Sequence, residues 1–536
     1  MATAWILCDC FPEPEINVKQ FLFFRSGFIR LPLVVLAGFI FVLSTRAQQI
    51  KWSPLQKFSR DTRTFGYIAS GEGAFLVMEE NIKESTITFH EYDLDDLNIK
   101  ASNTFDFGSD SGRRFEYITS MKSQIMVFTS GFSEENEHYQ IFCTTFDMHG
   151  KKLADTTLMH FVLSESKTEA PEFGVELSPD STKMLLYFDP PLARRSSESI
   201  SFKCYDQSLD LIWEKDMLLP YTSDVVQVHS FLLDNSANVY MMSGENPEKD
   251  NRRWQRPMGG RYVVFFYNAK DKKLKEYDVS LKDKQVISVG FALVDNQDVV
   301  ICGYYSNDFK FSAAGTFLFT INASGGAVKT ATFMPFSQEF VGKLIQKSRE
   351  GEASLPDFYL DKIFIREDNS ILVIGEQYYI SEYIITDPTT GRQTIEYRFN
   401  FDDIVVTRID PGGRHLWNAK IPKRQYTTSD TEHFSYQCFD DGKRTRFYFN
   451  DHPDNEQKLS AMNEGEASLW SGGRQSVTTM IELTEEGKFT RKAIIKNKER
   501  DGALSPMVGN VDCNTPEVLG YKEGKEYRFV LVGHAR

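Results

Sequence analysis

Apolar and polar residues alternate with a period of two over short stretches of almost the whole chain. Runs rich in Val, Ile, Phe, Tyr and Thr recur about every 8 to 15 residues, between groups of Gly, Asn, Asp and Pro. A period of two places every second side chain on the same face of a strand, whereas the period of an amphipathic helix is almost absent. The pattern predicts an all-β protein.

A longer repeat organises these strands. Each copy has an alternating strand, a turn with Asp, Asn or Gly and a second strand, and two more strands joined by a tight turn precede it. Seven copies begin at Thr86, Tyr139, Ile200, Arg261, Thr316, Asp403 and Val477. Four antiparallel strands in about 50 to 60 residues are typical of one blade of a β-propeller. A row of β-sandwich domains is the alternative, but it does not explain the uninterrupted repeat.

Strand-like segments are left over at both ends of the repeats. They lie near Ile50, Met507, Val518 and Tyr527. Trp52 falls where Trp213 and Trp417 fall, in the outermost strand of a blade. We therefore predict an eighth blade made of three C-terminal strands and one N-terminal strand, which closes the ring and removes its exposed ends. Seven blades with a decorated C-terminus is the alternative.

The first 47 residues have the features of a signal peptide. Arg25 and Arg30 precede the apolar run Leu31–Leu43, and small residues flank position 46. The run is shorter than the ~20 residues that a transmembrane helix needs. We predict cleavage after Ala47 and a periplasmic, cell-surface or secreted location, with no transmembrane span in the mature protein. An uncleaved anchor is the alternative, and a start site placed too early would explain the acidic residues near the N-terminus.

Residues 48–536 are predicted to form a single propeller domain with insertions at 336–356 and 377–400. Because an exposed hairpin adds little core, we expect deletion of residues 377–400 to leave thermal unfolding almost unchanged. Within the first insertion, residues 337–347 have apolar side chains at helical spacing. This segment is predicted to be an amphipathic helix that packs on a blade or docks a partner.

Charge and cysteine content narrow the class of protein. The formal net charge of −14 provides no basic field for a phosphate backbone, so a nucleic-acid partner is not expected. Five cysteines follow the predicted signal peptide at wide spacings: Cys143, Cys204, Cys302, Cys438 and Cys513. An odd number without paired spacing argues against both a disulfide framework and a zinc site. We expect buried free thiols.

Two segments resemble known propeller repeats. Leu177–Phe188 (LSPDSTKMLLYF) resembles the repeat of TolB and WD40-like propellers, in which Pro-Asp forms a type I turn between the inner strands. Val405–Gln425 (VVTRIDPGGRHLWNAKIPKRQ) resembles a blade of quinoprotein-like propellers and of uncharacterised secreted propellers of Bacteroidetes. The resemblance implies a fold and a lineage but no function, because propellers support many unrelated functions.

Loop length separates the two faces of the predicted propeller. Turns between the first and second and between the third and fourth strands of each blade are short, whereas the other connections, on the opposite face, are long in most blades. We call the second face the long-loop face and expect the binding site there. The candidate ligand-binding residues are Arg194, Arg195, Arg252, Arg253, Trp254, Arg256, Tyr378 and Tyr379. Guanidinium groups beside aromatic rings suit carboxylates, sulfates or sugars, and a solvated loop is the alternative.

One loop has candidate metal ligands. Asp451, His452 and Asp454 place oxygen and nitrogen atoms close together, which fits calcium or another divalent cation. The alternative is a turn built from turn-forming residues. No other cofactor is expected.

Catalytic motifs are absent from the sequence. No nucleophile elbow, zinc-protease helix, P-loop or dinucleotide fingerprint occurs. The main hypothesis is an exported, non-enzymatic binding or scaffold propeller that engages a protein or a glycan through the long-loop face. The alternative is a hydrolase or lyase for polysaccharide or peptide, with carboxylates from different blades meeting at the axis. A quinone- or haem-dependent oxidoreductase is disfavoured because Cys-x-x-Cys-His is missing.

Overall fold

The computed structural model of the chain describes residues 49–533, apart from connecting segments within that range. The segments left out are 60, 72, 109–111, 123, 134–137, 163–172, 189–196, 223–224, 246–261, 280, 282–283, 295–297, 308–312, 323–327, 345, 348–352, 355–357, 387, 460–465, 473–474, 498–501, 507 and 509–516. The predicted signal peptide lies outside the described residues.

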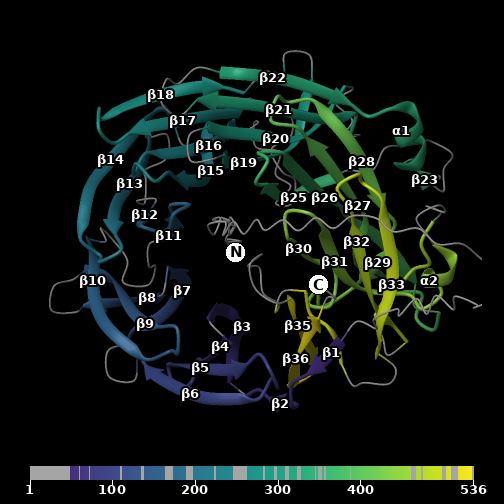
Figure 1. Cartoon of the computed structure of the whole chain (residues 1–536), viewed down its shortest axis with the longest axis horizontal. Coiled ribbons are helices and arrows are strands. Elements are labelled where there is room, and N and C mark those ends of the chain that lie inside the picture. The colour runs from purple at the N-terminus through teal and green to yellow at the C-terminus, as the bar shows by residue number, and fades with distance from the viewer. Residues whose placement is uncertain are drawn as a thin grey trace, which may run out of the picture.

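Eight antiparallel sheets, each built on four strands, form a closed ring (Figure 1). Blade 1 contains β3 (Thr62–Gly71), β4 (Ala74–Asn81), β5 (Thr86–Asp93) and β6 (Ile99–Asp106). Blade 2 contains β7 (Arg114–Met121), β8 (Gln124–Ser133), β9 (His138–Asp147) and β10 (Lys152–Val162). Blade 3 contains β11 (Phe173–Leu177), β12 (Lys183–Phe188), β13 (Ser197–Asp206) and β14 (Leu211–Thr222). In each of these blades the first strand lies nearest the axis and the fourth lies at the rim (Figure 1).

The same order continues around the ring. Blade 4 contains β15 (Val226–Leu233), β16 (Val239–Glu245), β17 (Tyr262–Asn268) and β18 (Lys273–Asp278). Blade 5 contains β19 (Gln285–Val294), β20 (Asp298–Ser306), β21 (Gly315–Asn322) and β22 (Val328–Pro335). Blade 6 contains β25 (Phe358–Ile365), β26 (Ile371–Thr386), β27 (Gln393–Ile409) and β28 (His415–Ile421), and β29 (Gln425–Thr427) also pairs with β27. Blade 7 contains β30 (Gln437–Asp440), β31 (Thr445–Asp451), β32 (Val477–Leu483) and β33 (Phe489–Lys496).

Blade 8 joins the two ends of the chain, as the sequence predicted. It contains β34 (Ala503–Leu504), β35 (Glu517–Glu523), β36 (Glu526–Gly533) and, at the rim, β1 (Gln49–Trp52), and β2 (Gln56–Lys57) extends the pairing on β36. Gln49 is opposite Gly533 and Trp52 is opposite Val530. Backbone hydrogen bonds that would be exposed at the ends of an open ring are thereby made within the sheet. The predictions of eight blades and of this closure are confirmed.

The core lies between neighbouring blades. Val264 and Phe266 of blade 4 pack in one buried cluster with Val299 and Phe317 of blade 5, and equivalent clusters separate the other blades. Tryptophans of outermost strands connect blades at the rim. Trp417 donates from Nε1 to the carbonyl of Glu485 in blade 7 at 2.7 Å. Each blade therefore covers the apolar face that its neighbour cannot cover alone.

Short elements decorate this ring. The helix α1 (Gln338–Leu344) is followed by the two-stranded ribbon of β23 (Gln346–Lys347) and β24 (Ala353–Ser354), so the helix is shorter than the predicted 337–347. Phe340 of α1 is buried against Phe336, which gives the helix a packing role on blades 5 and 6. A single-turn helix, α2 (Asn455–Lys458), follows β31. Within the described part of the chain, no helix is both long enough and apolar enough to span a membrane.

Candidate functional site

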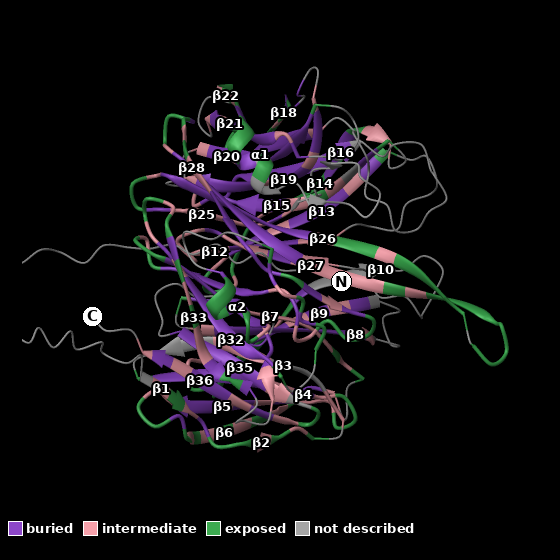
Figure 2. Cartoon of the chain, turned by 90° about the vertical axis from the view of Figure 1, so that its right-hand side faces the viewer, coloured by how far each residue is buried: buried purple, intermediate pink, exposed green. Residues whose placement is uncertain are grey.

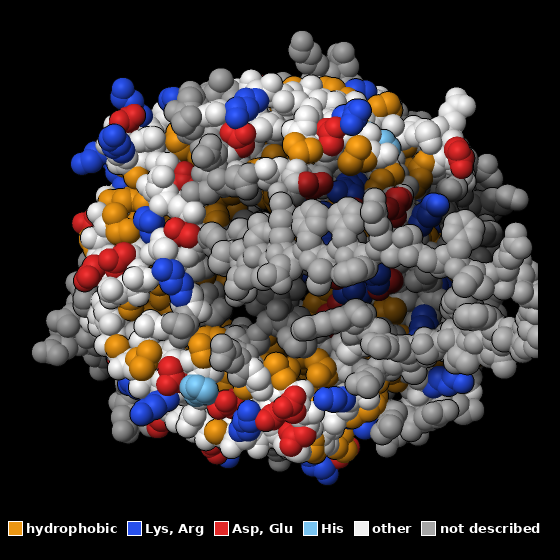
Figure 3. Space-filling model, viewed as in Figure 1, with side chains coloured by type: hydrophobic (Ala, Val, Ile, Leu, Met, Phe, Trp, Pro, Cys, Tyr) orange, Lys and Arg blue, Asp and Glu red, His pale blue; other side chains and the backbone are white. Residues whose placement is uncertain are grey.

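The short turns have the local chemistry that the sequence predicts. Between β15 and β16, Asp234 Oδ1 accepts hydrogen bonds from the backbone of Ser236 and Asn238, both at 2.8 Å. Between β13 and β14, Asp206 Oδ1 accepts equivalent bonds from Ser208 and Asp210. Aspartates at such positions satisfy turn donors and are not available for other chemistry. Figure 3 views this short-turn face, on which acidic and basic side chains are interspersed around the ring.

The most prominent described feature of the opposite face is a β-hairpin, residues 378–400, which we call the arm. β26 pairs with β25 only as far as Gln377, yet the pairing between β26 and β27 continues from Tyr378 opposite Phe401 to Thr386 opposite Gln393. Figure 2 shows this two-stranded ribbon projecting well beyond the blades. The arm therefore extends the second and third strands of blade 6 out of the propeller on the long-loop face.

One face of the arm is rich in exposed apolar side chains, and Glu382, opposite Tyr397, is its one charged residue. Ile380 is opposite Phe399 and Ile384 is opposite Ile395, so these side chains share one face with Tyr397. The exposed fractions are 43% for Ile380, 69% for Ile384, 58% for Ile395 and 48% for Tyr397. Side chains that stay this exposed contribute little to the stability of the fold, and exposed apolar groups of this kind are typical of interaction surfaces.

The other face of the arm is held to the propeller by stacking. The Arg398 guanidinium lies 3.9 Å from the ring centroid of Tyr383 and 4.9 Å from that of Tyr426 in β29. Its Nε atom also donates to Glu396 Oε1 at 2.9 Å. Because Arg398 bridges a tyrosine of the arm and a tyrosine of the blade, it restrains the direction in which the arm projects.

The two predicted tyrosines lie at the base of the arm and have different surroundings. Tyr378 packs its ring against Phe401 and Tyr359, with centroids 5.1 and 5.7 Å away. The hydroxyl of Tyr379 donates to Asp402 Oδ2 at 3.1 Å, and its side chain is 38% exposed. Burial, reinforced by the charge of Asp403, raises the pKa of Asp402 to about 6. Tyr378 has a packing role, whereas Tyr379 combines an anchored hydroxyl with an accessible ring.

A buried ion pair lies beneath the arm. Lys423 Nζ is 2.6 Å from Glu376 Oε1, and the two side chains are 0% and 5% exposed. The same ammonium donates to the Phe401 carbonyl at 2.7 Å and to Gln425 Oε1 at 3.1 Å, while Ser435 donates to Glu376 Oε2 at 2.7 Å. A buried charge with this many partners cannot move without losing several of them. The base of the arm is therefore rigidly connected to β29 and to the start of blade 7.

The predicted arginine-rich loops lie outside the described residues. Arg194 and Arg195 belong to segment 189–196, and Arg252, Arg253, Trp254 and Arg256 belong to segment 246–261. Both segments connect the second and third strands of their blades, as the arm does in blade 6. Their assignment to ligand binding stays a prediction.

Asp451 has structural partners in the loop for which a metal site was predicted. Its Oδ1 accepts from Asn455 Nδ2 at 2.6 Å, and its Oδ2 accepts from Thr479 Oγ1 at 3.1 Å and pairs with Arg491. His452 Nδ1 lies 3.6 Å from the exposed Asp454 carboxylate. Among the described residues there is no group of three or more His, Cys, Asp or Glu side chains placed to hold a metal ion. The calcium hypothesis gains no support from this geometry.

Two carboxyl groups on innermost strands have strongly raised pKa values. Burial raises the pKa of Glu176 in β11 to about 8. Burial, followed by the charge of Glu376, raises the pKa of Asp361 in β25 to about 7, and Tyr436 donates its hydroxyl to Asp361 Oδ2 at 2.9 Å. The two strands lie in blades 3 and 6, well apart around the ring (Figure 1).

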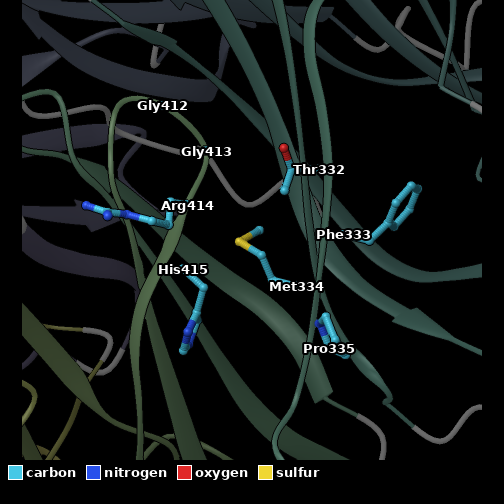
Figure 4. A pocket seen from close by; sticks show the side chains of 8 residues that line it. All are labelled: Thr332, Phe333, Met334, Pro335, Gly412, Gly413, Arg414 and His415. Carbon is cyan, nitrogen blue, oxygen red and sulfur yellow. The ribbon is translucent and has the colours of Figure 1, made fainter.

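A recess of about 460 Å³ lies at the outer rim between blades 5 and 6. Figure 4 shows Met334 of β22 pointing towards the turn between β27 and β28, whereas Phe333 points away from it. Arg414 of this turn pairs with Asp410 at 3.0 Å. The residues that line the recess are Thr332, Phe333, Met334, Pro335, Gly412, Gly413, Arg414 and His415. Its titratable side chains are Arg414 and His415.

Comparison with known proteins adds no functional assignment. No family model matches the chain, and its sequence matches no curated protein. Among solved structures it is similar to the Dos1 propeller, with 9% identity over 90% of this chain and 95% of the other and a TM-score of 0.40. It is also similar to the WD40 domain of SCAP from fission yeast, with 7% identity over 91% of this chain and 98% of the other and a TM-score of 0.37. A third similar structure is dipeptidyl peptidase 4 of Porphyromonas gingivalis, with 10% identity over 86% of this chain and 65% of the other and a TM-score of 0.34.

Likenesses at this level carry no functional argument, and the propeller fold is established by the strand order itself. The resemblance to secreted propellers of Bacteroidetes is not supported by the comparisons.

The apolar side chains of the arm were not among the residues selected from the sequence. The signal was present, because YYISEYIIT from Tyr378 and TIEYRFN from Thr394 continue the alternation of a blade strand beyond the expected length. Only the pairing of β26 with β27 shows that the isoleucines and Tyr397 share one exposed face.

Proposed function

We propose that this protein is an exported, non-enzymatic binding or scaffold propeller that engages a protein or glycan partner through its long-loop face. The observation that carries the proposal is the arm, which presents an exposed apolar face on a rigid base. The ion pair of Lys423 with Glu376 and the stacking of Arg398 hold that base in place. Ordered apolar surface that projects into solvent is typical of interaction sites and rare elsewhere on soluble proteins.

Export is the part of the proposal that rests on the sequence. The apolar run Leu31–Leu43 and the small residues before Gln48 support a cleaved signal peptide. The expected product in the exported fraction of the producing cell begins at Gln48, and N-terminal sequencing measures this directly. Exported protein that retains residues 1–47 would show that this segment is an uncleaved anchor and not a signal peptide.

The binding face is tested by site-specific photo-crosslinking in the producing cell. A photoreactive phenylalanine analogue replaces Tyr397 on the arm in one variant and Lys272, in an exposed short turn of blade 4, in the other. We expect adducts of defined mass from position 397 and none from position 272. Equal labelling at both positions, or labelling at 272 alone, would contradict the assignment of the face.

The alternative, a hydrolase or lyase with an axial active site, stays a prediction. Glu176 and Asp361, the carboxyl groups with raised pKa values on innermost strands, belong to blades 3 and 6. Paired-carboxylate hydrolysis needs two such groups on either side of one bond, less than about 10 Å apart.

A further inference from the structure

The arm has backbone edges that no described strand covers. Beyond Gln377, β26 has no second partner strand in the described part of the chain, and β27 has none between Gln393 and Arg398. A two-stranded ribbon of this kind is marginally stable on its own, and its free backbone N–H and C=O groups can pair with another strand. The edge of β26 from Tyr379 to Thr386 is the longer of the two.

Three free edges at the rim, those of β14, β18 and β33, carry several charged residues or proline, which discourage pairing. In β18, four of the six residues, KLKEYD, are charged. β14 contains Glu214, Lys215, Asp216 and Pro220, and β33 contains Arg491, Lys492 and Lys496. Such residues are the usual means by which soluble proteins protect exposed strand edges.

The edge of β26 lacks this protection. From Tyr379 to Thr386 the sequence is YISEYIIT, in which Glu382 is the single charged residue and proline is absent. The isoleucines and tyrosines here have high strand propensity. Among these free edges, the arm therefore combines the features that favour pairing with another strand.

We propose that the arm is a self-association surface, on which the β26 edge of a second copy of this chain pairs antiparallel across a two-fold axis. The pairing forms a four-stranded sheet in which Ile384 of one copy lies diagonally across from Ile380 and Ile384 of the other. A register centred on Tyr383 places Glu382 opposite Ile384 of the partner subunit and keeps the two glutamates from facing each other. Closed two-fold contacts of this type are self-complementary.

The arm is the place where charge opposes contact between two copies least. Two copies with a formal net charge of −14 each repel one another over most of their surfaces. The arm is nearly neutral, since Glu382, Asp387 and Glu396 are offset by Arg392 and Arg398, which leaves 3 − 2 = 1 net negative charge. Its polar end, with exposed Thr390 and Arg392, is unsuited to insertion into lipid. Added salt should tighten the contact, because it screens the overall repulsion.

Sedimentation equilibrium of the protein expressed from its full coding chain tests the proposal between about 1 and 100 µM, the range of a moderate contact. We expect a monomer–dimer equilibrium that shifts towards the dimer in higher salt. Ile384→Lys should weaken it by at least about tenfold, because each dimer then buries two lysines. Leu218→Lys is the matched control, since Leu218 is 68% exposed and Ile384 is 69% exposed, and it should leave the equilibrium unchanged.

A cross-linking measurement does not depend on how Ile384→Lys folds. Tyr383→Cys should form a covalent dimer under mild oxidation, whereas Leu218→Cys and the unsubstituted protein should not. A chain that stays monomeric throughout the range, or that dimerises equally with Ile384→Lys, overturns the proposal. Co-sedimentation of a monomeric chain with neutral phospholipid vesicles would overturn it in favour of lipid. Adducts to another protein at position 397, without dimers, would overturn it while leaving the proposed function intact.

Discussion

Four carboxyl groups at the base of the arm differ in how they are paired. Glu376 and Asp403 form ion pairs with Lys423 and Lys420. Asp361 and Asp402 instead have raised pKa values, of about 7 and about 6. Their ionised forms are therefore less stable in the folded protein than in the unfolded chain.

Asp361→Asn should stabilise the protein at alkaline pH. The pKa of Asp361 rises from 3.8 to about 7 on folding, so the folded state binds its proton more tightly, and ionisation lowers the free energy of unfolding as pH rises above about 4. Asparagine still accepts the hydrogen bond from Tyr436. We expect a gain of about 1 to 3 kcal/mol at pH 8 that narrows as pH falls towards 4.

Urea unfolding at several pH values measures this difference, with Asp95→Asn on an exposed turn as the control. If Asp361→Asn raises the free energy of unfolding by the same amount at every pH, the pKa of Asp361 is not raised in the folded protein.

The four described cysteines should be unreactive in the folded protein. Cys143, Cys204, Cys302 and Cys438 are buried free thiols, and burial raises the pKa of Cys302 to about 12. Because the thiolate is the reactive form, a thiol reagent at pH 8 should label these positions only after unfolding. Peptide mass spectrometry of labelled native and unfolded protein reads each position separately. Labelling of Cys302 at the rate of a free thiol in the native state would contradict its burial.

At the scale of elements, the arm consists of a fixed base and a free outer part. Tyr379 bonds to Asp402, Asn400 Nδ2 donates to Ser381 Oγ at 2.9 Å, and Arg398 stacks on Tyr426. Beyond Ser381 and Arg398 the strands contact mainly each other. The structure therefore changes the expectation for deleting residues 377–400, because that deletion would also remove the buried Gln377 and the partner of Asp402.

A shorter deletion should be tolerated. Ser381 is opposite Arg398, so replacing residues 382–397 with Asn-Gly closes the hairpin with a two-residue turn. We expect the free energy of unfolding to change by less than about 1 kcal/mol, since the residues removed are mostly exposed. Deletion of residues 377–400 should cost about 3 kcal/mol or more, because Asp402 and the surroundings of Lys423 lose buried partners.

Differential scanning calorimetry of the two deletions measures the contrast. Equal melting temperatures for the two variants would show that the base of the arm contributes nothing to stability.

For the whole molecule, ring closure depends on a few N-terminal residues. Trp52 packs against Tyr521 with ring centroids 5.0 Å apart, and the Arg528 guanidinium lies 4.5 Å from its ring. Ser53 exchanges backbone and side-chain hydrogen bonds with Phe529 at 2.9 and 2.8 Å. Contacts that join residues so distant in sequence form late and stabilise the ring as a unit.

A chain that begins at Ser59 should therefore lose cooperativity. Compared with one that begins at Gln48, it lacks β1 and β2 and exposes the edge of β36 and the ring of Tyr521. We expect a loss of about 3 to 5 kcal/mol and a broader transition. Thermal unfolding followed by circular dichroism compares the two chains, and a point variant, Trp52→Ala, should fall between them. Identical unfolding of the two chains would mean that the ring is closed without its N-terminal strand.

The sequence by itself determined the fold class, and it predicted eight blades and the way in which the ring is closed, with seven blades left as the alternative. It could do so because strand alternation, turn residues such as Asp234 and Asp206, and the shared position of Trp52, Trp213 and Trp417 are local or repeated signals. It also indicated that Cys143, Cys204, Cys302 and Cys438 are buried, since each lies within an apolar strand. The fifth predicted free thiol, Cys513, lies outside the described residues.

Only the tertiary structure decided which exposed and buried groups come together at the arm. The pairing of Glu376 with Lys423, and the grouping of Ile384 with Ile395 and Tyr397, join positions on different strands. Asp451 illustrates the same limit, because the partners that give it a structural role, Thr479 and Arg491, follow it by 28 and 40 residues. Strand register and blade packing bring such residues together, and a period of two along one strand contains no information about either.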